Sequence, residues 1–252
     1  RHPQRFFGDM VDHLRAPGFF TAVAGTSVLG TQVVLFTASY RTALALGAAA
    51  AVLWVGLTYT IFAAFTIKTI KPALDKGISG AWLLAVVATQ SLAVLGSLLA
   101  AHFHAPWKIA VNFFALSMWL WGGMLYTWLM ALIFYRYMSF RLAPEDLAPP
   151  FWINMGAMAI STLAGSMLIL NVPDAPFLQA ILPFLKGFTI LYWATATWWI
   201  PMLLVLAVWR YVYMRFPLRY DPLYWGAVFP LGMYSAATHE MGQALALDFL
   251  PI

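Results

Sequence analysis

Seven apolar runs, each about as long as a membrane-spanning helix, divide this chain of 252 residues. A bilayer core of roughly 30 Å requires about 20 apolar residues in helical form. Runs bounded by charge, Pro or Gly lie at Pro17–Thr37, Ala43–Ile67, Ala81–Ala101, Ile109–Phe134, Phe151–Leu170, Gly187–Trp209 and Leu223–Leu247. They predict an all-α polytopic membrane protein in which residues 1–252 form a single transmembrane domain.

The sixth run has an ambiguous beginning. Its apolar character starts near Phe177, which makes it too long for one perpendicular span. Pro183 and Lys186 divide off a lead-in segment, and we expect this segment to lie at the membrane interface. A tilted helix is the alternative.

Composition excludes several function classes. Hydrophobic residues make up 63% of the chain and charged residues 9%, whereas a soluble domain carries about 25% charged residues. Cysteine is absent, which excludes disulfides, thiolate metal sites and cysteine nucleophiles. The sequence contains no P-loop, G-x-S-x-G or H-E-x-x-H pattern. We therefore expect neither an enzyme nor a bound cofactor.

The basic residues gather in alternate loops. Of the 14 Lys and Arg residues, most precede the first run or lie between runs two and three, four and five, or six and seven: Arg1, Arg5, Arg15, Lys68, Lys71, Lys76, Arg136, Arg141, Arg210, Arg215 and Arg219. The positive-inside rule then places the Arg1 end in the cytoplasm and Ile252 outside, with the protein in the plasma membrane. No basic run is interleaved with stacking aromatic residues, so nucleic acid is not an expected partner.

A weak internal repeat links the odd-numbered runs. Phe20–Ser27, Leu83–Gln90, Trp152–Ala159 and Trp225–Gly232 align without gaps, one helical hairpin apart, and each leads from a large residue into small and polar ones. Such helices are expected on the inside of a bundle, around a narrow path. The candidate pore-lining residues are Ala24, Thr26, Ser27, Val87, Thr89, Gln90, Asn154, Gly156, Ser161 and Ser235. Close helix packing alone is the alternative explanation for these residues.

One column of this alignment contains a single bulky residue. Ala24, Val87, Gly156 and Phe229 occupy equivalent positions, and Pro230 follows directly. A phenyl ring beside a proline kink in a central path would act as a hydrophobic plug, so Phe229 and Pro230 are the candidate gate. The alternative is a Phe packed in the ordinary way beside a transmembrane Pro.

Three segments carry a resemblance to a known family. They are APGFFTAVAGTSVLG (Ala16–Gly30), PPFWINMGAMAISTLAGS (Pro149–Ser166) and WGAVFPLGMYSAAT (Trp225–Thr238). Together they resemble the tellurite-resistance/dicarboxylate transporter family, which includes the slow-type anion channels of plants. The resemblance covers essentially the whole chain.

The resemblance implies ten helices in five hairpins, arranged quasi-symmetrically around a pore made by the odd helices, usually in a homotrimer. A pore Phe in the ninth helix gates conduction in this family, and Phe229 falls at that place. The chain then corresponds to family helices three to nine. We expect it to be a fragment that lacks the first hairpin and the last helix.

Two transport mechanisms remain open. The first is an anion channel, or channel-like transporter, that passes small monovalent anions or C4-dicarboxylates, with Lys186 drawing anions into an outer vestibule. Snorkelling of Lys186 to the headgroups is the alternative interpretation. The second is a proton-coupled dicarboxylate or tellurite carrier in which His239 or Glu240 titrates, two residues that are otherwise simply interfacial.

A membrane-embedded enzyme or haem subunit is a third hypothesis. It would use His102, His104 or His239. His102 and His104 flank Phe103 in a short loop rather than facing one another across spans, and a His-x-His pair without further ligands is a poor metal site. We therefore expect no metal.

Overall fold

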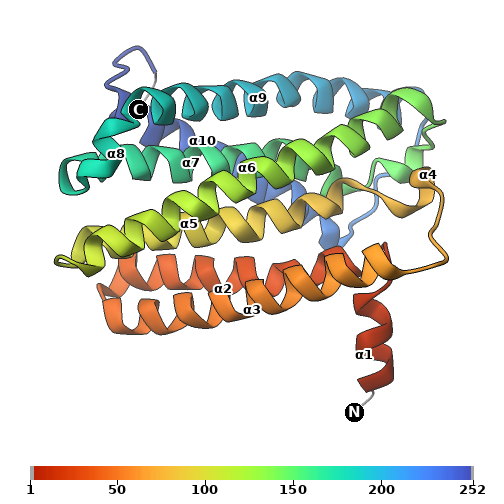
Figure 1. Ribbon diagram of the computed structural model, residues 1–252. Coiled ribbons are helices and arrows are strands. Elements are labelled where there is room, and N and C mark those ends of the chain that lie inside the picture. The colour runs from red at the N-terminus through yellow and green to blue at the C-terminus, as the bar shows by residue number, and fades with distance from the viewer. Residues whose placement is uncertain (1–2, 251–252) are drawn as a thin grey trace.

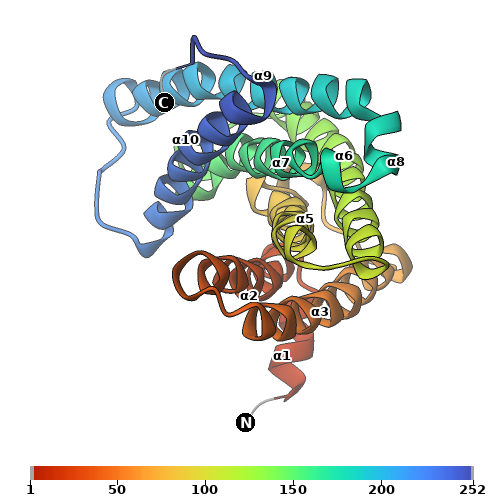
Figure 2. The same ribbon diagram turned by 90° about the vertical axis from the view of Figure 1, so that its left-hand side faces the viewer.

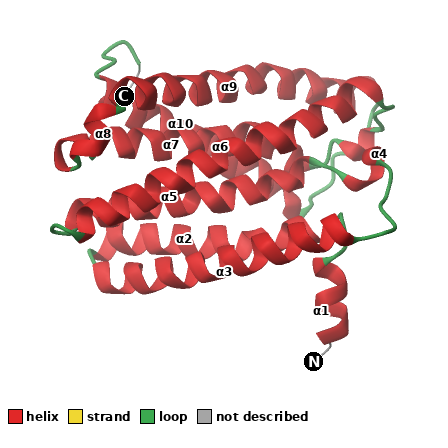
Figure 3. Cartoon of the chain, viewed as in Figure 1, coloured by secondary structure: helices red, strands yellow, loops and turns green. Residues whose placement is uncertain are grey.

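The protein is a bundle of long antiparallel helices in the computed structural model, which describes residues 3–250 (Figures 1 and 3). No strand occurs in this described range. Arg1 and Ile252, used above to assign orientation, lie outside it. The helices are α1 (Pro3–Met10), α2 (Ala16–Thr37), α3 (Tyr40–Ile67), α4 (Leu74–Gly77), α5 (Leu84–His102), α6 (Trp107–Ser139), α7 (Ile153–Leu170), α8 (Pro176–Ala180), α9 (Leu182–Val208) and α10 (Trp225–Leu245).

Six helical segments are long and apolar enough to cross a membrane. They are Ala16–Thr37, Tyr40–Ile67, Gly80–His102, Trp107–Ser139, Pro149–Leu170 and Leu182–Tyr213. They correspond to the first six predicted runs, which confirms the expected all-α polytopic membrane fold. The seventh run forms α10, which packs in the bundle but carries Thr238, His239, Glu240 and Gln243 and does not reach the same apolarity.

The long helices form an inner arc and an outer layer. Viewed along the bundle, α2, α5, α7 and α10 follow one another around the inside, and α3, α6 and α9 lie outside them (Figure 2). Burial agrees with this arrangement for α5, α7, α3 and α9, whereas α2, at one end of the arc, is only 28% buried and the outer helix α6 is 50% buried. The most apolar stretch of the α5 span is 89% buried and that of the α7 span 83%, against 22% for the α3 and α9 spans. The odd-numbered runs are therefore the inner helices, as their composition predicts.

The beginning of α9 differs from the sequence expectation. Pro183 lies in the first turn of α9, which starts at Leu182, and so does not divide off the segment before Lys186. Proline fits the first helical turn because the N–H that it lacks would have no intrahelical acceptor there. The lead-in segment is instead the separate short helix α8.

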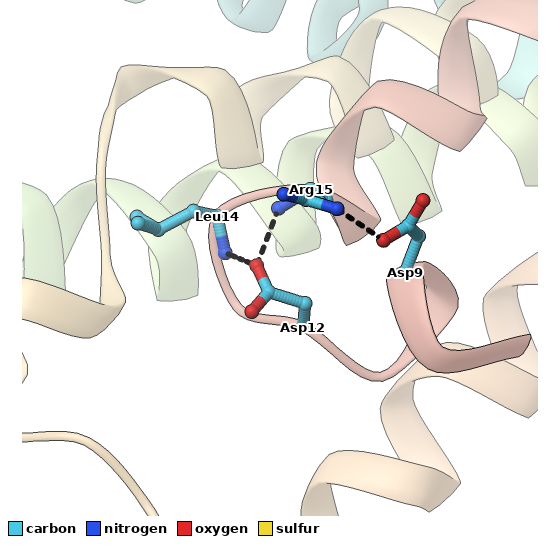
Figure 4. Close-up of polar contacts among 4 residues, drawn as sticks. All are labelled: Asp9, Asp12, Leu14 and Arg15. Carbon is cyan, nitrogen blue, oxygen red and sulfur yellow. Dashed lines mark hydrogen bonds and ion pairs between the residues drawn. The ribbon is translucent and has the colours of Figure 1, made fainter. Parts of the chain in front are cut away.

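The N-terminal helix α1 lies across the direction of the bundle rather than along it (Figure 1). Its corner with α2 is closed by polar contacts (Figure 4). Asp12 Oδ1 accepts the backbone N–H groups of Leu14 at 2.9 Å and Arg15 at 3.0 Å. Arg15 Nη1 donates to Asp9 Oδ1 at 2.6 Å. These bonds fix the angle at which α1 leaves the bundle.

Arg136 at the end of α6 joins two loops. Its Nη1 donates to the Ile78 carbonyl and its Nη2 to Asp146 Oδ1, each at 2.8 Å. The Arg136 side chain is 11% exposed and that of Asp146 30%. The charge count treats Arg136 as a topology determinant only, whereas the structure shows that it also clamps the loops that precede α5 and α7.

We predict that Arg136→Gln destabilises the fold. The substitution leaves the Asp146 carboxylate without its ion-pair partner, and we expect a loss of about 2 kcal/mol because that carboxylate is partly exposed. Thermal unfolding in detergent, followed by tryptophan fluorescence, measures the change. Arg141→Gln is the matched control, since Arg141 is exposed in the adjacent loop and its replacement removes the same charge. Equal shifts in both variants would contradict the clamp.

Candidate functional site

Four inner helices meet at one cavity of about 300 Å³. The four residues of the aligned column all line it: Ala24 from α2, Val87 from α5, Gly156 from α7 and Phe229 from α10. The residue three positions earlier in each helix lines it as well, which gives a second layer of Thr21, Leu84, Ile153 and Gly226. Residues three apart lie on the same face of a helix, so the repeat in the sequence appears here as two stacked layers of wall.

The second layer was missed by the sequence analysis. Its signal was nonetheless present, because counting back one helical turn from each column residue identifies all four members. Thr21 is the one hydroxyl residue among them, and its Oγ1 donates to the Gly18 carbonyl of its own helix at 2.6 Å. The two layers therefore present apolar surface to the cavity and contain no charged residue.

Phe229 is the only large side chain in its layer. It is 45% exposed, although it lies on an inner helix. Ala24, Val87 and Gly156 leave space beside it, so the phenyl ring faces small or medium-sized neighbours.

Pro230 presses α10 against α7. A Cβ atom added at Gly156 would lie 2.8 Å from both Cβ and Cγ of Pro230, so only glycine permits this approach. The helix α10 continues without interruption through Pro230. The Pro230 ring packs against the notch left by Gly156.

Two further bonds tie α10 to α9. Trp193 Nε1 donates to Thr238 Oγ1 at 3.0 Å, and the hydroxyls of Thr197 and Tyr234 lie 2.8 Å apart. Together with the Gly156 contact, they position the helix that carries Phe229.

Thr89 and Gln90 do not line the cavity. The Thr89 hydroxyl accepts the Trp54 indole N–H at 2.7 Å and donates to the Ala85 carbonyl at 2.8 Å. Gln90 Nε2 donates to the Trp119 carbonyl at 3.0 Å. Both side chains therefore join α5 to the outer helices α3 and α6, where lipid would offer them no partner.

Asn154 and Ser161 are also engaged elsewhere. Asn154 Nδ2 donates to the Tyr137 hydroxyl of α6 at 3.3 Å. Ser161 Oγ donates to the Ala157 carbonyl at 2.7 Å, and the Ser161 carbonyl accepts the Trp119 indole N–H at 2.9 Å. The structure places these two residues in the contact between α7 and α6 rather than in the cavity wall.

The remaining polar candidates are scattered. Thr26 Oγ1 donates to the Ala22 carbonyl at 2.8 Å, whereas the buried Ser27 hydroxyl has no partner among the described residues. Ser235 is exposed and follows Phe229 by six residues, about 240° around the helix. Ser235 and Phe229 therefore lie on different faces of α10.

The charged candidates lie on two helices, Lys186 on α9 and both His239 and Glu240 on α10. Lys186 is exposed on the outer helix α9 and does not line the cavity. His239 is half-buried, and its Nε2 lies 2.9 Å from Gln243 Nε2. Glu240 is half-buried and follows Phe229 by eleven residues, which is within about 20° of the same helical face. Glu240 is thus the titratable side chain that shares the face of the candidate gate.

The loop histidines have no metal-site geometry. The His102 ring stacks on Tyr40, with centroids 3.6 Å apart and planes 2° from parallel, and so joins the ends of α5 and α3. His104 lies in the loop that follows α5. Within residues 3–250, no group of three His, Cys, Asp or Glu side chains is placed to hold a metal ion.

Comparison with known proteins identifies the family. The whole chain, residues 1–252, matches the model of the family described as voltage-dependent anion channel. The chain belongs to this family. The match confirms the resemblance drawn from the three sequence segments and points to a channel or transporter rather than an enzyme.

Relatives from bacteria and archaea support the assignment. An uncharacterized membrane protein of Mycobacterium tuberculosis is 38% identical over 126 residues, which are 50% of this chain and 64% of the relative. An uncharacterized transporter of Methanocaldococcus jannaschii is 30% identical over 172 residues, 67% of this chain and 48% of the relative. The matched region therefore spans less than two thirds of these relatives. No solved structure matches the chain.

We predict that Gly156→Ala displaces α10. The added methyl group overlaps Pro230, a rigid side chain, and overpacking of this kind costs about 1–3 kcal/mol. The melting temperature in detergent should fall accordingly. Gly232→Ala on α10 is the matched control, because a Cβ there meets nothing within 4 Å. Unchanged melting of Gly156→Ala would show that the two helices are not held this closely.

Proposed function

We propose that this protein is a membrane anion channel, or channel-like transporter, whose path runs along the inner helices and is closed at rest by Phe229. The observation that carries the proposal is the cavity layer in which three helices contribute Ala24, Val87 and Gly156, and the fourth contributes Phe229. Family membership supplies the transported class, and small monovalent anions or C4-dicarboxylates are the proposed substrates.

The proposed barrier is hydrophobic. An anion that enters the two apolar layers loses water and finds no charge or hydrogen-bond donor to replace it. Displacing the phenyl ring of Phe229 would widen the path at this layer until its width is set by Ala24, Val87 and Gly156. The excess of basic residues in one set of loops raises the local anion concentration at that mouth.

The surroundings of the path are part of the proposal. The arc has its two ends at α2 and α10 (Figure 2), and a further hairpin and helix would close it into the ring that the family resemblance implies. A homotrimer with one path in each subunit, and location in a bacterial inner membrane with the Arg1 end cytoplasmic, complete the proposed assembly.

We predict that Phe229→Ala increases anion conductance by at least tenfold, because removing the ring opens the narrowest layer. Planar-bilayer recording of the full-length protein in asymmetric chloride, and then in malate, measures the change. Phe36→Ala is the matched control, since Phe36 lies at the end of α2 and is 81% exposed. If the wild type conducts and Phe229→Ala conducts to the same extent, the assignment of Phe229 as the gate is wrong.

A proton-coupled dicarboxylate or tellurite carrier is the second candidate. Glu240 supports it, since this half-buried carboxylate lies on the Phe229 face of α10 and has no partner within the described residues. His239, whose ring nitrogen lies beside Gln243, would assist the same proton movement.

For the carrier, we predict that Glu240→Gln abolishes pH-driven malate uptake into liposomes, because an amide cannot take up and release a proton. Glu145→Gln, in the loop before α7, is the charge-matched control. Uptake in Glu240→Gln that still follows the pH gradient would exclude this residue as the coupling group.

A further inference from the structure

Arg210 is a buried cation without an acidic partner. It lies directly after α9, in the π-helical turn Trp209–Tyr213, and is 7% exposed. Nη1 donates to the Leu147 carbonyl, whereas Nε has no acceptor. In the described part of the chain, no carboxylate pairs with this guanidinium. Because arginine stays protonated, the site holds a permanent, unneutralised positive charge.

Aromatic rings hold the guanidinium in place. Its central carbon lies 5.0 Å from the Tyr211 ring centroid and 4.3 Å from that of Phe216. The chain folds back after the π-helical turn, and the Phe216 N–H donates to the Arg210 carbonyl at 3.0 Å. Cation–π contacts of this kind offset part of the cost of burying the charge but supply no acceptor for Nε. The wide turn thus holds the guanidinium in a fixed position, and π-helical turns are frequent at functional sites.

A groove begins at this guanidinium. It is a cavity of about 270 Å³ between α9, α10 and the loop before α7. Beside Arg210, its polar groups include the hydroxyls of Tyr211 and Tyr224, which lie 2.9 Å apart. Along the two helices the wall is aliphatic and consists of Leu203, Leu206, Ala207, Ala227, Val228 and Leu231.

We propose that this groove binds an anionic phospholipid, with its phosphate on Arg210 and an acyl chain along the aliphatic wall. A phosphate accepts paired N–H donors from one edge of a guanidinium, and Nε lies on such an edge. The groove lies near the end of the membrane-spanning segment Leu182–Tyr213, where an acyl chain would remove its aliphatic walls from water. Free phosphate would neutralise the charge but leave those walls uncovered.

The proposal does not depend on the conduction path. Val228 faces the lipid groove, whereas Phe229 lines the central cavity, so the two sites use different faces of α10. A protein that failed to conduct anions would still be expected to bind lipid here.

Native mass spectrometry of the purified full chain in mild detergent tests the proposal. Titration with phosphatidylglycerol should give at least tenfold tighter binding than phosphatidylcholine with the same acyl chains, and Arg210→Gln should abolish this preference. Arg219→Gln is the matched control, because it removes the same charge from an exposed site outside the groove. Equal binding of the two lipids, or a preference that persists in Arg210→Gln, would overturn the assignment.

A second variant keeps the test valid if Arg210→Gln does not fold. Ala207→Phe keeps the guanidinium and fills the aliphatic part of the groove. It should weaken phosphatidylglycerol binding at least tenfold. Titration with inorganic phosphate separates the two sources of the anion. If phosphate displaces the lipid at equal concentration, or if Ala207→Phe retains full lipid affinity, the site is one for a free anion and the lipid assignment fails.

Discussion

Polar groups that enter the hydrocarbon must find their partners inside the protein, and this requirement determines where each one lies. The Thr89 hydroxyl, the Gln90 amide and the Asn154 amide all meet groups on the outer helices. Those contacts bind the inner arc to the outer layer. They also leave the cavity with apolar walls, because these three side chains are directed toward the outer helices.

Because the wall of the cavity is apolar, the lining residues differ mainly in the size of their side chains. Ala24, Val87 and Gly156 allow the helices of the arc to approach one another, and Gly156 accommodates Pro230 at a distance that no other residue permits. With its neighbours so small, the phenyl ring of Phe229 is the one bulky side chain of this layer, which is why we propose it as the gate. The proposed barrier is therefore steric and hydrophobic, and it depends on the same small residues that line the cavity.

The sequence was sufficient to predict the seven long helices, the inner position of the odd-numbered runs and the four column residues, because apolar length and a gapless repeat are one-dimensional patterns. It was insufficient for the polar wall, where helical phase decides. Thr89 follows Val87 by two residues, about 200° around the helix, and so faces the outer layer. Gln90 follows Val87 by three residues and lies only about 60° from it, yet its amide bonds to Trp119 of α6. Counting charges likewise placed Arg136 and Arg210 in loops but gave no sign of their burial.

The helix α10 connects the two proposed sites. One face carries Phe229 into the cavity, and the neighbouring Val228 lies in the groove beside Arg210. A helix moves as a rigid unit over a few turns, so any displacement of α10 that withdraws the phenyl ring also changes the width of that groove. A molecule that binds one width of the groove more tightly than another must, by thermodynamic linkage, shift the position of Phe229. The link requires only the rigidity of α10 and its Pro230 contact with Gly156.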